Sequence, residues 1–558
     1  MGIELPPAIS SALTQLPFLS SIGSALNGDQ RNIPLVLGTV VVVLATSSVL
    51  KFYNGLKLVS HLPGLRTPFS PYSFLGFTAP VTWWNPGLKF LWEGRKDHYL
   101  YKYFGSENFS ITPWISGAPL IVSSNLDVLR QTAFGSFRSD FEKPEEMSRA
   151  LLFWGDNLAG TDGEIWRRHR RIVNPAFNNK LYQRVWAKTA ELYEQMADAE
   201  GWGDKDTIDI EVVQKLTHKF TLLIISTCGF GLDFDWAEPP APPDGRMTVQ
   251  QAFKIVVDRN MAVTFMPRWV HKLVPTTYFR EVDEAINEMS RFMKAQVTSR
   301  KAAVRSGNGD IDAFTLMVKA NEEEGSKYKL NESELIGNVF VLLFAGHETT
   351  AVTLAAAMIY LALNPEIEKE VLQNIIEVVG WNGKPTFEDY GKLDKVLAVF
   401  LEVLRMYPSG HLMFRKATKD TTLKLPRPVG EEGADTIPIA KGTMMVIDMV
   451  GLQYNPRYFE DPESFKPSRW YGVSKDSDAF TAFSIGPREC IGRKFATVEA
   501  VALLALLLRD FKIEPLLLNG ETLDAWKTRV LDAQLLITLG VSNASVRFVR
   551  RQKGTASS

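Results

Sequence analysis

Cys490 lies in the segment FSIGPRECIGRKFA, residues 483–496, between Gly486 and Gly492. Glycines at such positions allow tight turns and a close approach of the backbone to a large flat group. A cysteine at the start of a helical pattern and among cations should have its thiolate form favoured, and a thiolate can ligate iron. The residues alone equally allow a buried structural cysteine in a glycine-rich turn. The cations of this segment are Arg488, Arg493 and Lys494.

The chain of 558 residues contains one other cysteine, Cys228, in the apolar run LLIISTCGF. We expect it to be an ordinary core residue. Two cysteines exclude a disulfide framework and a cysteine-rich zinc site, and they favour a reducing compartment. With 62 basic and 63 acidic residues the formal net charge is -1, so the overall charge does not indicate a nucleic-acid partner.

The cysteine segment and four other motifs resemble those of the cytochrome P-450 family. Phe483, Gly486, Arg488, Cys490 and Gly492 fill every fixed place of that family's haem-binding loop, FxxGxRxCxG. The other motifs follow the family's order and usual separations. They are Trp166 with Arg170 (WxxxR), AGHETT at 345–350 (the oxygen-activating motif of a central helix), Glu402 with Arg405 (ExxR), and Phe465, Pro467 and Arg469 (FxPxR). The resemblance implies the cytochrome P-450 fold, mainly α with minor β sheets, preceded by one transmembrane helix.

Specific roles follow from this resemblance. Cys490 would be the proximal thiolate ligand of a haem b iron, a ligand that favours cleavage of the O–O bond. Thr349 would hydrogen-bond iron-bound dioxygen, and Glu348 would take part in the proton relay. Thr350 is expected to be a packing residue, and His347, in the variable place of the motif, is not expected to bind iron. The remaining catalytic positions are Ala345 and Gly346.

Haem also carries two propionates, which need cationic partners, and arginine suits a carboxylate because it can bind both oxygens. Glu402 and Arg405, spaced i to i+3, share a helix face and can pair. The resemblance adds Arg469 and implies a buried network behind the cysteine loop, whereas a solvated surface pair is the alternative. The expected haem partners besides the cysteine loop are Trp166, Arg170, Arg415 and Arg488.

The central helix that carries AGHETT should begin after Asn331, with Glu334 as its capping-box partner, and end near Leu363. Such a helix would be roughly 48 Å long. A second membrane span is the alternative, but an acid such as Glu348 in its middle would be costly in lipid. Gly346, followed by Glu-Thr-Thr, is expected to allow a local break in the helix.

An uncharged apolar run, IPLVLGTVVVVLATSSVL, occupies residues 33–50. As a helix it would span roughly 27 Å, close to the thickness of a thin bilayer; a buried core helix is the alternative. The excess of basic residues after the run places the later chain in the cytosol. We expect a single-pass protein of the endoplasmic reticulum membrane with an N-terminal segment (1–30), a transmembrane anchor (31–52), a proline-rich linker (53–71) and a haem-thiolate catalytic domain (72–558).

The resemblance implies a monooxygenase that inserts one oxygen atom from O2 into a hydrophobic substrate. Its electrons would come from an NADPH-cytochrome P-450 reductase, with cytochrome b5 as a second candidate donor. Arg167, Arg168 and Arg171 either form a basic patch that steers an acidic donor or a merely solvated helix face. The expected substrate-pocket residues are Val341, Phe344, Ala345, Leu412 and Met413.

The sequence resembles fungal microsomal members of the family, several of which oxidise triterpenoids. A terpenoid or sterol-like substrate of secondary metabolism is therefore expected. Two other functional classes stay open, a haem-thiolate isomerase or dehydratase and a non-catalytic haem protein that binds a lipid or a gas. The intact pair Glu348 and Thr349 argues against both.

Overall fold

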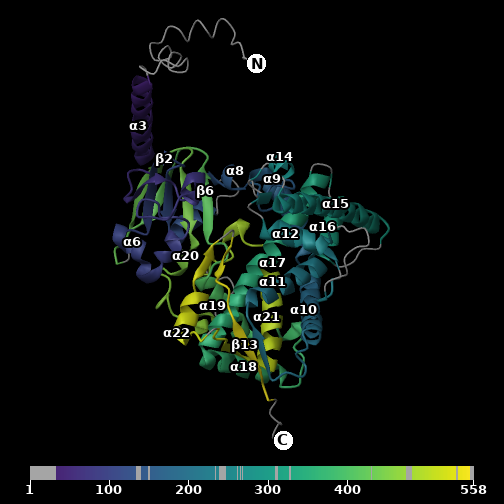
Figure 1. Cartoon of the computed structure of the whole chain (residues 1–558). Helices are drawn as coiled ribbons and strands as arrows, with labels where there is room; N and C mark the ends of the chain where they lie inside the picture. The colour runs from purple at the N-terminus through teal and green to yellow at the C-terminus, as the bar shows by residue number, and fades with distance from the viewer. Residues whose placement is uncertain are drawn as a thin grey trace.

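The computed structural model describes residues 33–552 apart from 134–139, 149–150, 233, 238–246, 260–261, 264–265, 267, 275, 308–311, 324, 326–327, 429, 473–479, 519 and 536–537. The predicted N-terminal segment, residues 1–30, lies outside this range. The described chain is mainly helical with small sheets, which confirms the predicted fold class. Helices α10, α11, α17 and α21 lie in one part of the molecule, and the sheet that contains β2 and β6 lies beside the base of α3 (Figure 1).

The α-helices are α3 (Ile33–Leu58), α4 (Phe74–Thr78), α5 (Phe90–Glu93), α6 (Tyr99–Phe104), α7 (Leu126–Ala133), α8 (Glu145–Ser148), α9 (Gly163–Val173), α10 (Asn179–Ala199), α11 (Val213–Ile224), α12 (Val249–Asp258), α14 (Arg268–Leu273), α15 (Thr277–Arg305), α16 (Ala313–Glu323), α17 (Glu332–Leu363), α18 (Pro365–Val379), α19 (Asp394–Met406), α20 (Met449–Gln453), α21 (Arg493–Asp510) and α22 (Leu523–Val530). Short 3-10 helices are η2 (Lys96–His98), η3 (Asn174–Ala176), η5 (Phe387–Asp389), η6 (Pro467–Trp470) and η7 (Gly486–Arg488), and η4 (Ile225–Gly229) is a π-helix.

The strands are β1 (Gly64–Phe69), β2 (Asn108–Ser116), β3 (Leu120–Ser123), β4 (Phe141–Glu142), β5 (Thr207–Ile210), β6 (Leu412–Ala417), β7 (Thr421–Pro426), β8 (Ala434–Ile439), β9 (Met444–Asp448), β10 (Phe511–Pro515), β11 (Ala533–Leu535), β12 (Leu539–Val541) and β13 (Val546–Arg550). In the described part of the chain they form a six-stranded sheet of order β1-β2-β3-β9-β6-β4, a three-stranded sheet and two hairpins, β7–β8 and β11–β12.

The central helix α17 has the predicted limits. The Asn331 side chain accepts a hydrogen bond from the backbone N–H of Glu334 at 3.0 Å, and the Glu334 carboxylate accepts one from the backbone N–H of Asn331 at 2.8 Å. This capping box satisfies two backbone donors that the first turn leaves unpaired. The helix ends at Leu363 before a proline, and 72% of its most apolar window is buried inside the protein. It is therefore a core helix, and the alternative of a second membrane span is wrong.

The local break expected at Gly346 is absent, because α17 is helical throughout its 32 residues. The Thr349 hydroxyl donates to the Ala345 carbonyl at 2.9 Å and the Thr350 hydroxyl to the Gly346 carbonyl at 3.2 Å, which keeps both side chains within the helical pattern. Gly346 serves packing instead. A Cβ there would lie 2.9 Å from the Ile225 side chain, so the glycine lets η4 approach the helix closely.

The apolar helix α3 projects from the body of the protein (Figure 1). Its stretch Leu37–Leu58 is long and apolar enough to cross a membrane, and none of its most apolar window is buried. The alternative of a buried core helix is therefore wrong. The helix continues to Leu58, past the anchor boundary predicted at residue 52, because residues 53–58 carry no helix-breaking residue other than Gly55, which packs against β2.

The predicted proline-rich linker is only partly a linker. Within it, Gly64–Phe69 form β1, the edge strand of the main sheet, which pairs in parallel with β2. Arg66 fixes this pairing, because its Nη1 donates to the Ser110 hydroxyl at 2.9 Å. The register shifts between Thr67 and Phe69, around the intervening proline, and an edge strand tolerates such an interruption. The folded body thus begins before the predicted boundary at residue 72.

Candidate active site

The cysteine loop leads directly into α21 and has a tight backbone. The backbone N–H of Cys490 donates to the Phe483 carbonyl at 2.9 Å, which closes the loop on itself. Gly486 has a φ of +74°, so the predicted need for glycine is real at this position. Ser484 also has a positive φ, of +63°, which is strained for a non-glycine residue and occurs most often at functional sites. Gly492 is the N-cap of α21.

Cys490 is enclosed by protein, yet its side chain is accessible because it faces two cavities. Burial raises the pKa of its thiol above the ordinary value, against the opposing effects of the Gly492 backbone, Arg170 and the Arg493 backbone. The expectation that the surroundings alone favour a thiolate is therefore wrong, since desolvation outweighs the nearby donors and cations. A bound metal cation reverses that balance, because a coordinating thiol is deprotonated outright.

One cavity, of about 290 Å³, lies between the cysteine loop and α17. It brings the Cys490 thiol and the Thr349 hydroxyl to the same space, although the two residues are far apart in the sequence. Leu412 and Met413, two of the expected substrate-pocket residues, line it as well. The full lining is Thr349, Thr350, Thr353, Phe400, Leu404, Ser409, Gly410, Leu412, Met413, Met449, Ala482, Phe483, Ser484, Arg488, Cys490 and Ala496.

The other expected substrate-pocket residues do not line this cavity. Val341 and Phe344 are buried, and the Phe344 ring stacks with Phe340 at 6.0 Å between centroids. Ala345 is exposed but is not among the lining residues. Val341 and Phe344 therefore pack inside the protein core and do not form the wall of the cavity.

A second cavity, of about 610 Å³, also contacts Cys490. Its rim carries Arg170, Arg493, Lys494 and the acidic Glu489. Arg170 Nη1 donates to the Glu489 carbonyl at 3.2 Å, which places this arginine beside the cysteine loop. Arg170 and Trp166, both from α9, thus contact adjacent residues of the cysteine loop, Glu489 and Arg488.

Glu348 and Thr349 differ in their surroundings. Glu348 is buried, and its Oε1 accepts a hydrogen bond from the Thr538 hydroxyl at 2.6 Å. Burial raises the pKa of Glu348 above its ordinary value, and the charge of Asp258 adds to this, while the Thr538 hydrogen bond opposes it. Thr349 is half-buried and faces the cavity. Thr538 could not be predicted, because its contact joins segments far apart in the chain.

The neighbouring His347 lies away from the cavity. Its ring packs against Phe253 at 5.4 Å and His218 at 6.2 Å between centroids, and its Nδ1 lies 3.0 Å from the Leu343 carbonyl. Burial lowers the pKa of His347 to about 4, so the ring is neutral. This placement agrees with the expectation that it does not bind iron.

Three cations, Arg488, Arg415 and Lys143, lie near one another, and Arg488 lines the first cavity. Arg488 lies over the Trp166 ring at 4.4 Å and pairs with Asp162. Arg415 is buried, forms no ion pair with a carboxylate in the described chain, and contacts the Met413 sulfur at 3.1 Å. Burial lowers the pKa of Arg415 and of Arg488 to about 10.

The third cation, Lys143, was not predicted, because a single lysine in a loop gives no signal in the sequence. Its Nζ donates to the Ala159 carbonyl at 2.5 Å. Burial lowers the pKa of Lys143 well below its ordinary value, and the positive charges of Arg488 and Arg415 lower it further. Of these three cations only Arg488 forms an ion pair with a carboxylate in the described chain, so the group leaves positive charge that the two propionates of a haem can balance. The residues present therefore fit a haem.

The three residues of the predicted network behind the cysteine loop contact one another. Arg405 Nε and Nη2 donate to the two Glu402 oxygens at 3.0 and 2.9 Å, and Arg469 Nε approaches Glu402 Oε1 at 3.3 Å. Both Glu402 and Arg405 are completely buried, so the alternative of a solvated surface pair is wrong. Trp470 Nε1 adds a hydrogen bond to Glu402 at 2.9 Å that the motif did not indicate.

The basic residues of α9 are already engaged within the protein. Arg167 pairs with Glu164, Arg168 pairs with Glu334 of the α17 capping box, and Arg171 lies over the Tyr328 ring at 4.8 Å. Arg171 is exposed and Arg167 and Arg168 are half-buried, so this helix face is partly solvated, and the interpretation as a patch that steers an acidic donor stays a prediction. Arg168 also ties α9 to the start of the central helix.

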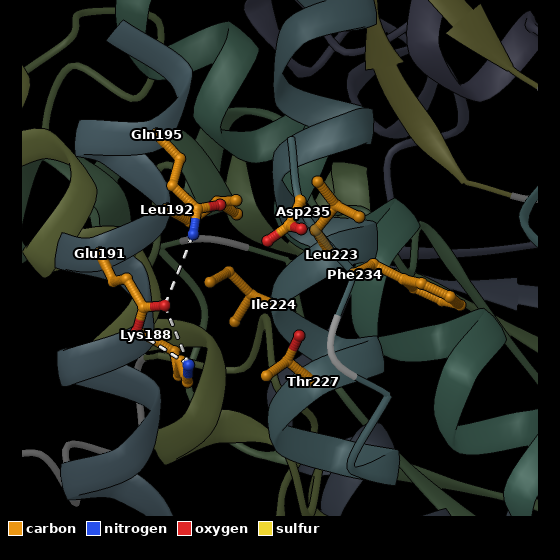
Figure 2. Close-up of a pocket in the computed structure, with 9 residues that line it drawn as sticks. All are labelled: Lys188, Glu191, Leu192, Gln195, Leu223, Ile224, Thr227, Phe234 and Asp235. Carbon is orange, nitrogen blue, oxygen red and sulfur yellow. Dashed lines mark hydrogen bonds and ion pairs between the residues drawn. The ribbon is translucent and has the colours of Figure 1, made fainter. Parts of the chain in front are cut away.

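A further pocket, of about 190 Å³, lies between α10 and α11 and does not reach the cysteine loop (Figure 2). Its polar wall is satisfied internally, because Lys188 Nζ lies 2.8 Å from Glu191 Oε2. None of its lining residues lines either of the cavities at Cys490. It is therefore separate from the candidate active site.

Comparison with known proteins agrees with this geometry. The family model described as Cytochrome P450 matches residues 96–531. Cytochrome P450 monooxygenase 124 of Postia placenta is 34% identical over 90% of this chain and 96% of its own length. The chain belongs to the cytochrome P450 family. Cytochrome P450 monooxygenase prx9 of Penicillium rubens is 26% identical over 70% of this chain and 72% of its own length. Cyclooctat-9-en-7-ol 5-monooxygenase of Streptomyces melanosporofaciens is 29% identical over 69% of this chain and 78% of its own length.

Membership makes this protein a P450 monooxygenase, and the family implies a haem iron with a cysteine thiolate ligand. Of the two cysteines in the chain, Cys228 is completely buried, and burial raises the pKa of its thiol to about 12. It lines neither cavity at the cysteine loop. Cys490 is the cysteine with the access that a ligand needs.

Proposed function

We propose that this P450 is anchored in a membrane by α3 and inserts one oxygen atom from O2 into an apolar substrate, with electrons from a separate NADPH-dependent reductase. The observation that carries the proposal is the cavity shared by Cys490 of the loop and Thr349 of α17, with Glu348 buried directly before Thr349. This arrangement unites a ligand for iron with groups that can hold and move protons.

Cys490 holds the haem iron in this proposal, and Arg488, Arg415, Lys143 and Trp166 hold the propionate edge. When bound, the haem activates dioxygen, and its thiolate ligand favours O–O cleavage. Arg405 and Glu402 keep the fold behind the loop fixed, because their two hydrogen bonds are buried. Phe483 lines the cavity in which the cofactor would lie, and the positive φ of Gly486 shapes the loop that carries Cys490.

Two residues of α17, Thr349 and Glu348, can bind and transfer protons. Thr349 presents a hydroxyl to the cavity, and Glu348 next to it is a buried carboxyl whose protonated form is favoured by burial. A carboxyl of raised pKa can act as a proton donor near neutral pH. Ala345, one turn before Thr349, is exposed and has a small side chain, and its carbonyl accepts a hydrogen bond from the Thr349 hydroxyl, whereas Gly346 packs against Ile225.

The substrate is expected to be apolar, since Leu412, Met413, Phe400 and Leu404 line the cavity. We favour a terpenoid or sterol-like compound of secondary metabolism. A relative at 29% identity is named for an unsaturated alcohol, cyclooctat-9-en-7-ol, and curated relatives include fungal monooxygenases.

The electron donor is proposed to be an NADPH-cytochrome P450 reductase, with cytochrome b5 as a second donor, docking over the cavity rim that carries Arg170, Arg493 and Lys494. Cations there suit an acidic partner. The endoplasmic reticulum is the proposed location, because the exposed apolar helix α3 precedes the body and is followed by basic residues.

The proposal is tested with microsomes that contain the full chain and a P450 reductase, screened against terpenoids and sterols. We expect a hydroxylated product that forms only with both NADPH and O2 and that carries one atom of labelled oxygen from ¹⁸O2. A product formed from a hydroperoxide without NADPH would instead identify an isomerase or dehydratase. Ligand-induced spectral shifts with no turnover in the presence of reductase would indicate a non-catalytic binder.

A further inference from the structure

The hairpin β11–β12 near the C-terminus packs against α17 beside the Glu348–Thr349 pair. A Cβ on Gly540 of β12 would lie 3.0 Å from Val352 Cβ, so the strand approaches the helix as closely as a glycine permits. Val352 is one helical turn after Glu348. The backbone N–H of Leu539 also donates to the Ser409 carbonyl at 3.1 Å, which fixes the start of β12 from a second side.

This placement brings Thr538, directly before β12, to the carboxyl of Glu348. The Thr538 hydroxyl and Glu348 Oε1 are 2.6 Å apart. The other oxygen, Oε2, is buried and has no hydrogen-bond partner in the part of the chain that the structure describes. Thr538 thus holds this carboxyl through Oε1, whereas Oε2 is held by no hydrogen bond in the described chain.

Ser409 extends the connection to Thr349. Its hydroxyl lies 3.2 Å from the Thr353 hydroxyl and donates to the Thr349 carbonyl at 3.4 Å, while Thr353 donates to the same carbonyl at 2.7 Å. The hairpin, the segment after α19 and the middle of α17 therefore form one hydrogen-bonded unit.

The ionisable groups around Glu348 come from three helices. Asp258 of α12 and burial both raise the pKa of Glu348, and the Thr538 hydroxyl lowers it. His218 of α11 and His347 of α17 both have lowered pKa values because they are desolvated, so neither brings a positive charge at neutral pH. The neighbouring hydroxyl is therefore the group that opposes permanent protonation of the acid.

We propose that Thr538 is a positioning residue for proton delivery, which holds the Glu348 carboxyl in one orientation in both of its protonation states. A hydroxyl can donate to a carboxylate and accept from a carboxylic acid, so Thr538 matches Glu348 before and after it releases a proton. The inference rests on the proposed monooxygenase function. That reaction, RH + O2 + 2 e⁻ + 2 H⁺ → ROH + H2O, consumes two protons, which come from solvent and pass through Glu348.

The test uses the full-length holoenzyme with its reductase and the variants Thr538→Val, Thr538→Ser and Glu348→Gln. Infrared difference spectra recorded against Glu348→Gln isolate the Glu348 carboxyl band, whose pH titration gives its pKa without any substrate. We expect T538V to raise this pKa by about one unit and T538S to leave it near the parent value. Thr538→Ala, which also lacks the hydroxyl, is a second variant, and exposed Thr298→Val is the matched control for loss of a threonine hydroxyl.

In turnover, T538V should release more peroxide per NADPH consumed and lower the product yield about tenfold, since a mispositioned acid delivers protons slowly. Added to E348Q, it should have no further effect. An unchanged Glu348 pKa in both T538V and T538A, or a T538V defect of equal size in the E348Q background, would overturn the proposal. Absence of NADPH- and O2-dependent oxidation by the parent enzyme would instead refute the proposed function, while the infrared titration still decides the Thr538–Glu348 link.

Discussion

Arg405 and Glu402 form a two-point ion pair in which both side chains are completely inaccessible to solvent. The remaining donors of Arg405 are also used, because Nη1 lies 2.9 Å from the Gln453 carbonyl and 2.8 Å from the Pro462 carbonyl. The guanidinium thus joins α19 to the segments on either side of Phe459. Its planar fork is what allows one side chain to reach all these acceptors.

Arg405→Lys should therefore destabilise the protein strongly, because lysine keeps the positive charge but lacks the planar set of guanidinium donors. The expected loss in the free energy of unfolding is about 3 kcal/mol or more, with a fall in haem content. Denaturant unfolding and haem quantification measure both. Arg547→Lys is the matched control, since Arg547 also binds Asp209 through two nitrogens, but at the surface. If Arg547→Lys lowered the free energy of unfolding as much as Arg405→Lys, burial of the ion pair would not explain the effect at Arg405.

Lys143→Met removes the half-buried member of the cation group formed with Arg415 and Arg488. In holoenzyme it should speed loss of haem to an acceptor protein by about tenfold, because one partner of the propionates is gone. The exposed Lys441→Met is the control. A haem loss rate equal to that of the parent would show that Lys143 does not contact the cofactor.

In haem-free protein, Lys143→Met should instead be stabilising, and the gain should depend on pH. The pKa of Lys143 is lowered from 10.5 in the folded chain by burial and by two arginines, so the unfolded state binds more protons in the window between the folded value and 10.5. The parent gains stability as the pH rises through this window, and the variant lacks that gain. The advantage of K143M is thus full below the folded pKa and disappears near pH 10.5. A pH-independent difference in denaturant midpoints would show that the pKa of Lys143 is not lowered in the folded chain.

Asn331→Ala should lower the stability of the fold by about 1 kcal/mol through loss of the α17 cap. Asn331→Asp keeps the acceptor oxygen for the Glu334 N–H and should retain most of the stability. Thermal unfolding of the holoenzyme compares the two variants. Equal destabilisation by Asn331→Ala and Asn331→Asp would mean that the hydrogen bond to the side-chain oxygen does not stabilise the start of α17.

Removal of residues 1–50 should release the P450 from membranes and leave the haem domain intact. The cut spares the last turns of α3, where Gly55 packs against Thr112 and where Val59, directly after the helix, is completely buried. Fractionation after salt washing measures attachment, and the absorbance spectrum reports the haem site. Complete retention of the truncated chain on membranes would show that surfaces other than α3 hold it there.

Local signals account for the parts of this structure that could be predicted. The limits of α17 follow from an Asn-Glu capping box and a proline, and the ExxR pairing follows from helical spacing. The prediction of a break at Gly346 was wrong, because glycine also permits close packing, here against Ile225. A sequence does not distinguish these two uses of glycine.

The unpredicted residues all depend on contacts between distant segments. Lys143 lies close enough to Arg415 and Arg488 for their charges to lower its pKa. Trp470 donates a hydrogen bond to Glu402, and Thr538 donates one to Glu348. No sequence motif marks Lys143, Trp470 or Thr538. Strand β1 was missed for the same reason, because its partner β2 lies more than a helix away in the chain. Motifs therefore indicated the chemistry of the site, while its charge balance and its proton-handling neighbours required the fold.

The assignment of Cys490 as the haem ligand is tested most directly by the reduced, carbon-monoxide-bound difference spectrum of the full chain and of Cys490→Ala and Cys228→Ala. We expect the parent and C228A to show the strongly red-shifted Soret band of thiolate-ligated haem, and C490A to lack it. A band typical of neutral-thiol or histidine ligation in the parent, or a red-shifted band that survives in C490A, would contradict the account.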